Sequence, residues 1–129
     1  MGRWIVSNID YDYYAIADEI KNTSDTNEKQ ELINKVKEHN DSYYLLANGI
    51  VTKDNKELYD DIINYIINGN EKFHAGYLLI DKIVSREDKD LFDKIVEVAI
   101  QYPEHRKMLI ESDIITEDEA TEIELKNLY

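Results

Sequence analysis

The sequence matches itself, without a gap, at a spacing of 33 residues. Residues 38–70 read EHNDSYYLLANGIVTKDNKELYDDIINYIINGN, and residues 71–103 read EKFHAGYLLIDKIVSREDKDLFDKIVEVAIQYP. The shared positions include Tyr44-Leu45-Leu46 with Tyr77-Leu78-Leu79 and Ile50-Val51 with Ile83-Val84. A fixed period of this length is typical of stacked supersecondary units, each too small to bury its apolar face alone.

Weaker copies of the same unit extend the match to both sides. In residues 8–37, Tyr14, Ile16 and Ile20 align with Tyr44, Leu46 and Ile50 at an offset of 30. In residues 104–129, Ile114-Ile115-Thr116 repeats the junction seen as Ile50-Val51-Thr52 and Ile83-Val84-Ser85. The sequence therefore predicts one all-α domain over residues 1–129, a short helical-repeat (solenoid-like) stack of about four antiparallel helix pairs. Its units are 8–37, 38–70, 71–103 and 104–129.

Apolar residues at helical spacing predict the helices themselves. We expect helices over residues 8–21, 28–38, 42–51, 56–68, 89–101 and 117–127, with Tyr43, Leu46, Ala47 and Ile50 on one face of the third. Short polar side chains at the links are typical N-caps, and a Ser/Thr-x-x-Asp/Glu pattern predicts a capping box. The expected caps are Asp25 or Thr26, then Thr52, Ser85 with Asp88, and Thr116 with Glu119. We expect Gly69 and Pro103 to end the helices before them.

The 33-residue unit of two short helices, with an apolar second helix ending near Gly, resembles an ankyrin repeat. Residues 44–70 resemble it most and residues 77–103 next, which is about half of the chain. The sequence lacks the Thr-Pro-Leu-His opening, whose place is taken by Asn40-Asp41-Ser42-Tyr43 and Phe73-His74-Ala75-Gly76, and it lacks the usual Gly between the helices. A HEAT-like or irregular helical stack therefore stays open. The resemblance implies a protein-binding scaffold without chemistry of its own.

The charge favours a positively charged protein partner. The chain has 28 acidic and 15 basic residues, a net charge of −13. Nucleic acid and anionic membranes would both be repelled, so we expect neither as a direct partner. The alternative interpretation is that the charge only keeps a small protein soluble. With no cysteine, no signal-peptide pattern and no apolar run near the ~20 residues of a membrane span, a cytoplasmic protein is expected.

No pattern in the sequence indicates catalysis or a cofactor. His39 and His105 lie two units apart, and stacked helices are separated by about 10 Å, whereas zinc ligands lie at about 2.0–2.2 Å. We therefore expect no metal site. Neighbouring acids such as Asp60 and Asp61 arise by chance in helices this acidic. Nucleophile–base arrangements and phosphate-binding glycine loops are both missing from the sequence. We expect no catalytic residue and no cofactor.

Carboxylates gather at the links and at the helix starts that follow them. Stacking would align these positions along one edge, which we call the acidic ridge: Asp54, Glu57, Asp60, Asp61, Glu87, Asp88, Asp90, Asp93, Glu117, Asp118, Glu119 and Glu122. Asp10, Tyr11 and Asp12 form a further candidate group near the start of the chain. Acidic side chains also stabilise helix N-termini without any partner, so a purely structural role is the competing interpretation.

Ten tyrosines stand against two phenylalanines, which favours a role for tyrosine in binding. We expect Tyr14, Tyr44 and Tyr77 in the core, because they share a repeated position, and Tyr11 and Tyr59 on the surface.

The chain is interpreted as an inhibitor or immunity protein, monomeric or homodimeric. It would block a basic nucleic-acid-handling protein (nuclease, toxin or defence enzyme) by charge mimicry. The alternatives are an adaptor or assembly scaffold and a metal-dependent hydrolase.

Overall fold

The computed structural model describes residues 11–128, with side chains through residue 127, and this part of the chain contains helices and no strand. The helices, with two short 3-10 turns labelled η, are α1 (Tyr13–Asn22), α2 (Thr26–Glu38), α3 (Ser42–Ala47), η2 (Lys53–Asn55), α4 (Lys56–Asn68), η3 (Lys72–His74), α5 (Ala75–Ile80), α6 (Lys89–Ala99), α7 (Pro103–Glu111) and α8 (Glu117–Leu128). No helix in this range is long and apolar enough to cross a membrane. The prediction of an all-α chain is confirmed for the described residues.

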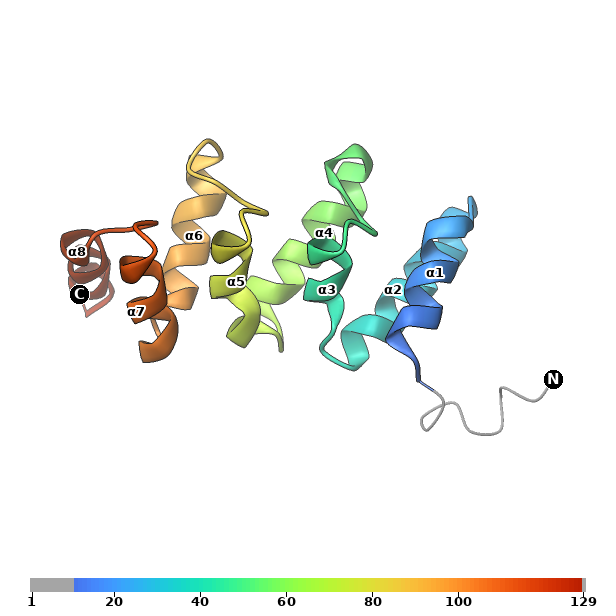
Figure 1. Ribbon diagram of the computed structural model, residues 1–129, viewed down its shortest axis with the longest axis horizontal. Coiled ribbons are helices and arrows are strands. Elements are labelled where there is room, and N and C mark those ends of the chain that lie inside the picture. Colours follow the sequence, from blue (N-terminus) through green and yellow to red (C-terminus); the bar gives the residue numbers. More distant parts are fainter. Residues whose placement is uncertain (1–10, 129) are drawn as a thin grey trace.

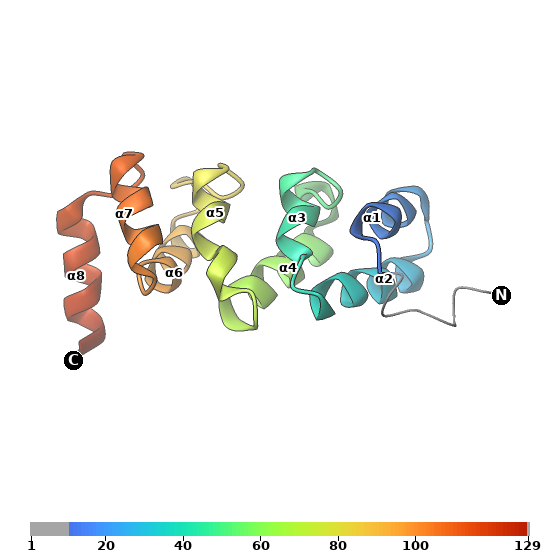
Figure 2. The ribbon, with the colours of Figure 1, turned by 60° about the horizontal axis from the view of Figure 1, so that its bottom comes forward.

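The helices follow one another along the long axis of the molecule (Figure 1). Helix α1 packs on α2, α3 on α4 and α5 on α6, while α5 also meets α7, and α6 meets both α4 and α8. In Figure 2, α1, α3, α5 and α7 form one row and α2, α4 and α6 form a second row below it. Each helix therefore contacts mainly its neighbours in the sequence, and the molecule is elongated.

The core is aliphatic and follows the helical period. In α4, Leu58, Ile62 and Ile66 lie on one face, with Ile63 and Ile67 beside them, and all five are buried. In α6 the buried set is Phe92, Ile95, Val96 and Ala99. Removing this apolar surface from water is the main force that holds such short helices in place, because helices of one to three turns are marginal alone.

Two of the predicted caps are formed as expected. Asp25 accepts hydrogen bonds from the backbone N–H groups of Asn27 (2.9 Å) and Glu28 (3.2 Å) and so caps α2. At α8, Thr116 Oγ1 accepts from the Glu119 N–H at 3.1 Å, and Glu119 Oε1 accepts from the Thr116 N–H at 2.8 Å. This reciprocal capping box starts α8 at the predicted residue, Glu117.

The predicted helix over 42–51 is too long, because α3 ends at Ala47. Ala47 was also expected on the apolar face of this helix, but it is exposed. The chain reverses at Gly49, whose φ of 72° lies in the left-handed region that glycine tolerates best. The N–H groups of Ile50 and Val51 then both donate to the carbonyl of Leu45. The carbonyls of Leu78 and Leu109 each accept the equivalent pair of bonds, from Ile83 and Val84 and from Ile114 and Ile115. The three apolar junctions of the sequence thus have one backbone geometry.

Other predicted helix ends also differ from the structure. Asp88 precedes α6 without a side-chain cap, so the predicted box with Ser85 is not formed. Thr52 caps η2 rather than α4, whose cap is Asn55. Pro103 does not end the helix before it, because α6 already ends at Ala99. It is instead the first residue of α7, where the missing N–H of proline costs no helical hydrogen bond. Helix α1 begins at Tyr13, later than predicted; residues 8–10 lie outside the described range.

Candidate functional site

Three tyrosines at equivalent sequence positions lie on the surface, so their predicted place in the core is wrong. Tyr14 is 79% exposed, Tyr44 42% and Tyr77 37%. In the short helix α3 the buried positions are Ser42, Tyr43, Leu45 and Leu46, which leaves Tyr44 on the outer side. Phe73, which the sequence interpretation did not single out, is 43% exposed.

These exposed rings belong to a continuous chain of aromatic contacts, which we call the aromatic row. Its members come from α1, α3, α5 and α7, the upper row in Figure 2, and from η3 and the residue before α7. Successive ring centroids are 5.3 Å apart for Tyr14 and Tyr13, 6.0 Å for Tyr13 and Tyr44, 5.6 Å for Tyr44 and His74, 6.3 Å for His74 and Tyr77, 5.1 Å for Tyr77 and His105, and 5.6 Å for His105 and Tyr102. Tyr43 contacts Tyr44, His74 and Tyr77, and Phe73 contacts His74 at 4.2 Å.

A fully buried carboxylate fixes the middle of the aromatic row. Glu71 accepts from the backbone N–H groups of Ser42 and Tyr43, each at 3.1 Å, and from the Ser42 hydroxyl. Its other neighbour is His74 Nδ1, 3.0 Å from Oε1. A negative group at the start of α3 satisfies amides that the helix itself leaves unpaired. Glu71 therefore ties the start of α3 to the segment that begins α5.

Ser42, Glu71 and His74 are residue types of hydrolytic triads, but their order is different here. In a nucleophilic triad the imidazole contacts the hydroxyl and takes its proton. In this structure Glu71 lies between Ser42 and His74, and Ser42 is fully buried. This arrangement positions a helix and offers no exposed nucleophile.

The far end of the aromatic row contains a second buried histidine. His105 packs against Gly76, where an added Cβ would lie 2.8 Å from His105 Nδ1. That nitrogen has no hydrogen-bond partner among the described residues. Burial lowers the pKa of His105, with a further lowering from His74, while Glu104 acts in the opposite direction. The neutral imidazole therefore packs as part of the base on which Tyr77 rests.

The acidic ridge divides into two groups of carboxylates. Four of them bind cations of the chain itself: Asp60 with Lys56 (2.5 Å), Asp61 with Lys37 (2.5 Å), Asp93 with Lys89 (2.6 Å) and Glu119 with Arg86 (2.9 Å). The remaining eight have exposed side chains: Asp54, Glu57, Glu87, Asp88, Asp90, Glu117, Asp118 and Glu122. The hydrogen bonds and charges of Asp60 and Asp93 raise the pKa values of Lys56 and Lys89, so these lysines stay charged and offset part of the ridge.

The candidate group near the start of the chain has structural partners. Tyr11 donates to Asp41 at 2.9 Å and its ring stacks on His39 at 3.7 Å, and burial together with that carboxylate raises the pKa of its phenol. Asp12 caps α1, and Asp10 lies outside the described residues. Tyr59 was expected on the surface but is buried, with its hydroxyl donating to the Ile83 carbonyl at 3.2 Å.

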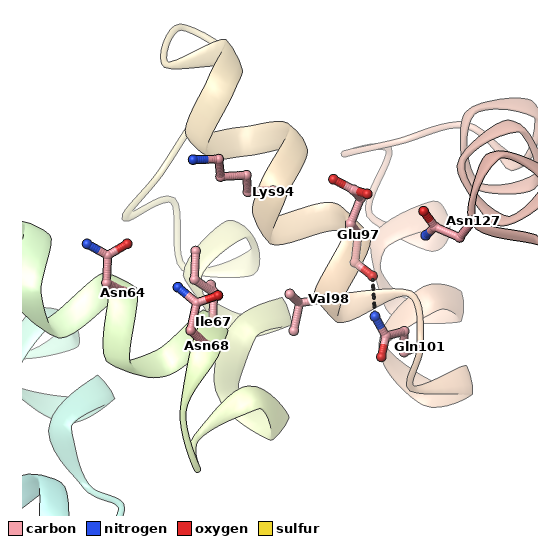
Figure 3. A pocket seen from close by; sticks show the side chains of 8 residues that line it. All are labelled: Asn64, Ile67, Asn68, Lys94, Glu97, Val98, Gln101 and Asn127. Carbon is pink, nitrogen blue, oxygen red and sulfur yellow. Dashed lines mark hydrogen bonds between the residues drawn. The ribbon is translucent and has the colours of Figure 1, made fainter. Parts of the chain in front are cut away.

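A polar groove lies between α4, α6 and α8 (Figure 3). Its volume is about 620 Å³, and its lining is Asn64, Ile67, Asn68, Lys94, Glu97, Val98, Gln101 and Asn127. Gln101 Nε2 donates to the Glu97 carbonyl at 3.1 Å. Asn64, Asn68, Gln101 and Asn127 carry carboxamides, which donate and accept hydrogen bonds, and Lys94 and Glu97 add one charge of each sign.

The described residues contain no group of three or more His, Asp or Glu side chains that could hold a metal ion. The aromatic row combines large exposed rings with a buried base. Comparison with known proteins gave no match to any family model, to any curated protein or to any solved structure.

Proposed function

We propose that this chain is a protein-binding module and that the aromatic row is its contact surface. The observation that carries the proposal is the exposure of the rings. Among the described residues five large hydrophobic side chains are exposed, and Tyr14, Tyr44, Phe73 and Tyr77 are four of them. Contiguous exposed apolar surface marks interaction sites, and tyrosine is enriched among the residues that dominate binding energy.

The charge of the chain selects the partner. A net charge of −13 favours a basic protein surface, and the eight exposed carboxylates of the acidic ridge supply negative potential that steers such a partner. The most concrete version is an inhibitor or immunity protein that covers the basic surface of a nuclease, toxin or defence enzyme. The four ion-paired carboxylates of the ridge contribute less, because their charge is offset within the chain.

We propose further that the helices form a repeat stack of antiparallel pairs. The support is the identical pair of backbone hydrogen bonds at the Leu45, Leu78 and Leu109 carbonyls, together with the 33-residue match of the sequence. In such a stack Tyr44 and Tyr77 occupy matching places in successive units. The row is then a periodic surface, suited to a partner that is contacted at several points.

The test measures how tightly the wild-type protein, a tyrosine variant and a control variant bind a partner captured from the native host. Replacing Tyr44 and Tyr77 by Ala should weaken partner affinity by tenfold or more, because truncated interface tyrosines cost about 2 kcal/mol each. Leu125→Ala is the matched control, since Leu125 is also exposed but lies on α8, away from the row. Unchanged partner affinity in the tyrosine variant would refute the proposal.

Charge reversal on the acidic ridge tests the second element of the proposal. Replacing Glu87, Asp88 and Asp90 by Lys should slow association and flatten its dependence on salt, with a smaller effect on dissociation. If the captured partner handles nucleic acid, wild-type protein should inhibit it and the tyrosine variant should not. A partner whose activity is unaffected at saturating protein would favour the adaptor interpretation over the inhibitor.

A further inference from the structure

Among the described residues, two rings outside the aromatic row are covered by cations of the chain itself. Lys37 Nζ lies 5.3 Å from the ring centroid of Tyr65, and Arg86 Cζ lies 4.8 Å from that of Phe92. No Lys or Arg of the described residues lies over a ring of the aromatic row in this way. No Lys or Arg of the described residues therefore competes for the exposed surface of Tyr14, Tyr44 and Tyr77.

We propose that the aromatic row binds arginine side chains of a partner polypeptide, one guanidinium to each exposed tyrosine. This inference rests on the protein-binding function proposed above and specifies its chemistry. The negative charge of the chain draws a cationic segment to the surface, and the π-face of a tyrosine attracts the cation directly. Arginine suits the row better than lysine because its guanidinium is planar, stacks on aromatic rings and is more weakly hydrated than an ammonium group.

The spacing of the tyrosines allows one segment to reach all three. Tyr14 and Tyr44 both contact Tyr13, and Tyr44 and Tyr77 both contact Tyr43, so each exposed ring lies within about 11 Å of the next, close to the ~8–10 Å between packed helix axes. In an extended chain, every third residue advances by about 10 Å, so arginines at that interval stay within this upper limit.

The base of the row contacts two of the three rings, Tyr44 and Tyr77, before binding. Tyr43 is buried between Tyr44 and Tyr77, and the Glu71 carboxylate fixes its backbone N–H. Rings that are already positioned lose less conformational freedom when a partner binds, which increases affinity. Several weak guanidinium contacts on one rigid surface add up through their shared chain.

The test uses two synthetic peptides of equal charge. Each has nine residues, in a Gly/Ser background, with three Arg in one and three Lys in the other at every third position. Binding is measured by calorimetry at low and at physiological salt. Wild-type protein should bind the Arg peptide about fivefold or more tightly than the Lys peptide, because exposed cation–π contacts are individually modest. Equal binding of the two peptides, or no binding of the Arg peptide at low salt, would overturn the proposal.

Variants of the row separate ring recognition from general charge. The combined Tyr14→Leu, Tyr44→Leu and Tyr77→Leu protein keeps apolar bulk without the ring faces, and it should bind both peptides equally. The corresponding Tyr→Phe protein keeps the faces and should keep the preference. Circular dichroism confirms that each variant is folded. Preference for Arg that survives in the Leu protein contradicts the assignment.

The outcomes also distinguish this inference from the proposed function. If the peptides show no preference but partner capture still depends on Tyr44 and Tyr77, the row binds protein by another chemistry. If wild-type protein sediments as a dimer and the Leu protein as a monomer, a second copy of the chain covers the row. Either result rejects arginine recognition, and the first leaves the protein-binding function in place.

Discussion

Replacing the buried Glu71 by Gln tests how α3 is held. The carboxylate faces donors on every side: two backbone N–H groups, the Ser42 hydroxyl and His74 Nδ1. A carboxamide offers one acceptor oxygen and turns an NH₂ group toward donors, so at least one buried N–H loses its partner. Each unsatisfied buried donor costs about 1–3 kcal/mol. With at least one donor left unpaired, we expect the free energy of unfolding to fall by about 1–3 kcal/mol.

Urea unfolding followed by circular dichroism measures this loss. The chain provides its own matched controls, because Glu38 and Glu104 stand 33 residues to either side of Glu71 and are exposed. Glu38→Gln and Glu104→Gln should change the free energy of unfolding by no more than about 0.5 kcal/mol. A loss below about 1 kcal/mol for Glu71→Gln would show that its hydrogen bonds do not hold the start of α3.

Three further predictions concern the second half of the chain. Gly76→Ala should lower the free energy of unfolding by about 1–2 kcal/mol through contact with the His105 ring, and in a His105→Ala background the same change should be neutral or stabilising in urea unfolding. Burial lowers the pKa of His105, so as the pH falls this imidazole is protonated in the unfolded chain before it is protonated in the folded one, and stability is lost as the pH falls through 6.5. In His105→Gln, the urea midpoint should therefore fall less between pH 7 and pH 5 than in wild type. Arg86 donates to Glu119 and to the Ile114 carbonyl (2.6 Å), but it is largely exposed. Arg86→Ala should therefore lower the thermal midpoint by only a few degrees, about 1 kcal/mol, and a larger drop would mean that this contact is stronger than exposed pairs allow.

Local patterns predicted the longer helices well. Helix α4 spans the predicted residues, 56–68, because its apolar residues repeat over three turns and Gly69 follows. The capping box at α8 was also predictable, since both of its members lie within four residues of each other. Signals of this kind need no knowledge of the rest of the fold.

The surface tyrosines were not predictable in the same way. In a helix of six residues a single position decides whether a side chain faces the core, and in α3 the two neighbours Tyr43 and Tyr44 are equally plausible on apolar character alone. The tertiary partners decide the choice: Tyr43 packs between Tyr44, His74 and Tyr77, and its neighbour is left outside. A residue that recurs in successive units of a repeat sequence can lie on the surface as well as in the core.

Glu71 shows the same limit for a buried charge. Nothing local separates it from Glu38 or Glu104, which share its place in the 33-residue match. The difference arises at the start of α3, where Asp41 makes no side-chain cap and instead accepts from Tyr11. The unpaired backbone N–H groups at the start of α3 donate instead to the carboxylate of Glu71, which lies 29 residues after Ser42.

That distance has a consequence for how the chain forms during synthesis. Ribosomes release a protein from its N-terminus, so residues 42–47 emerge well before the group that completes their first turn. Until η3 has left the exit tunnel, α3 is a six-residue segment with open amides, too short to persist in water. The start of α3 therefore lacks its partner until synthesis has passed Glu71, and we expect nascent chains halted before Glu71 to remain sensitive to protease around α3.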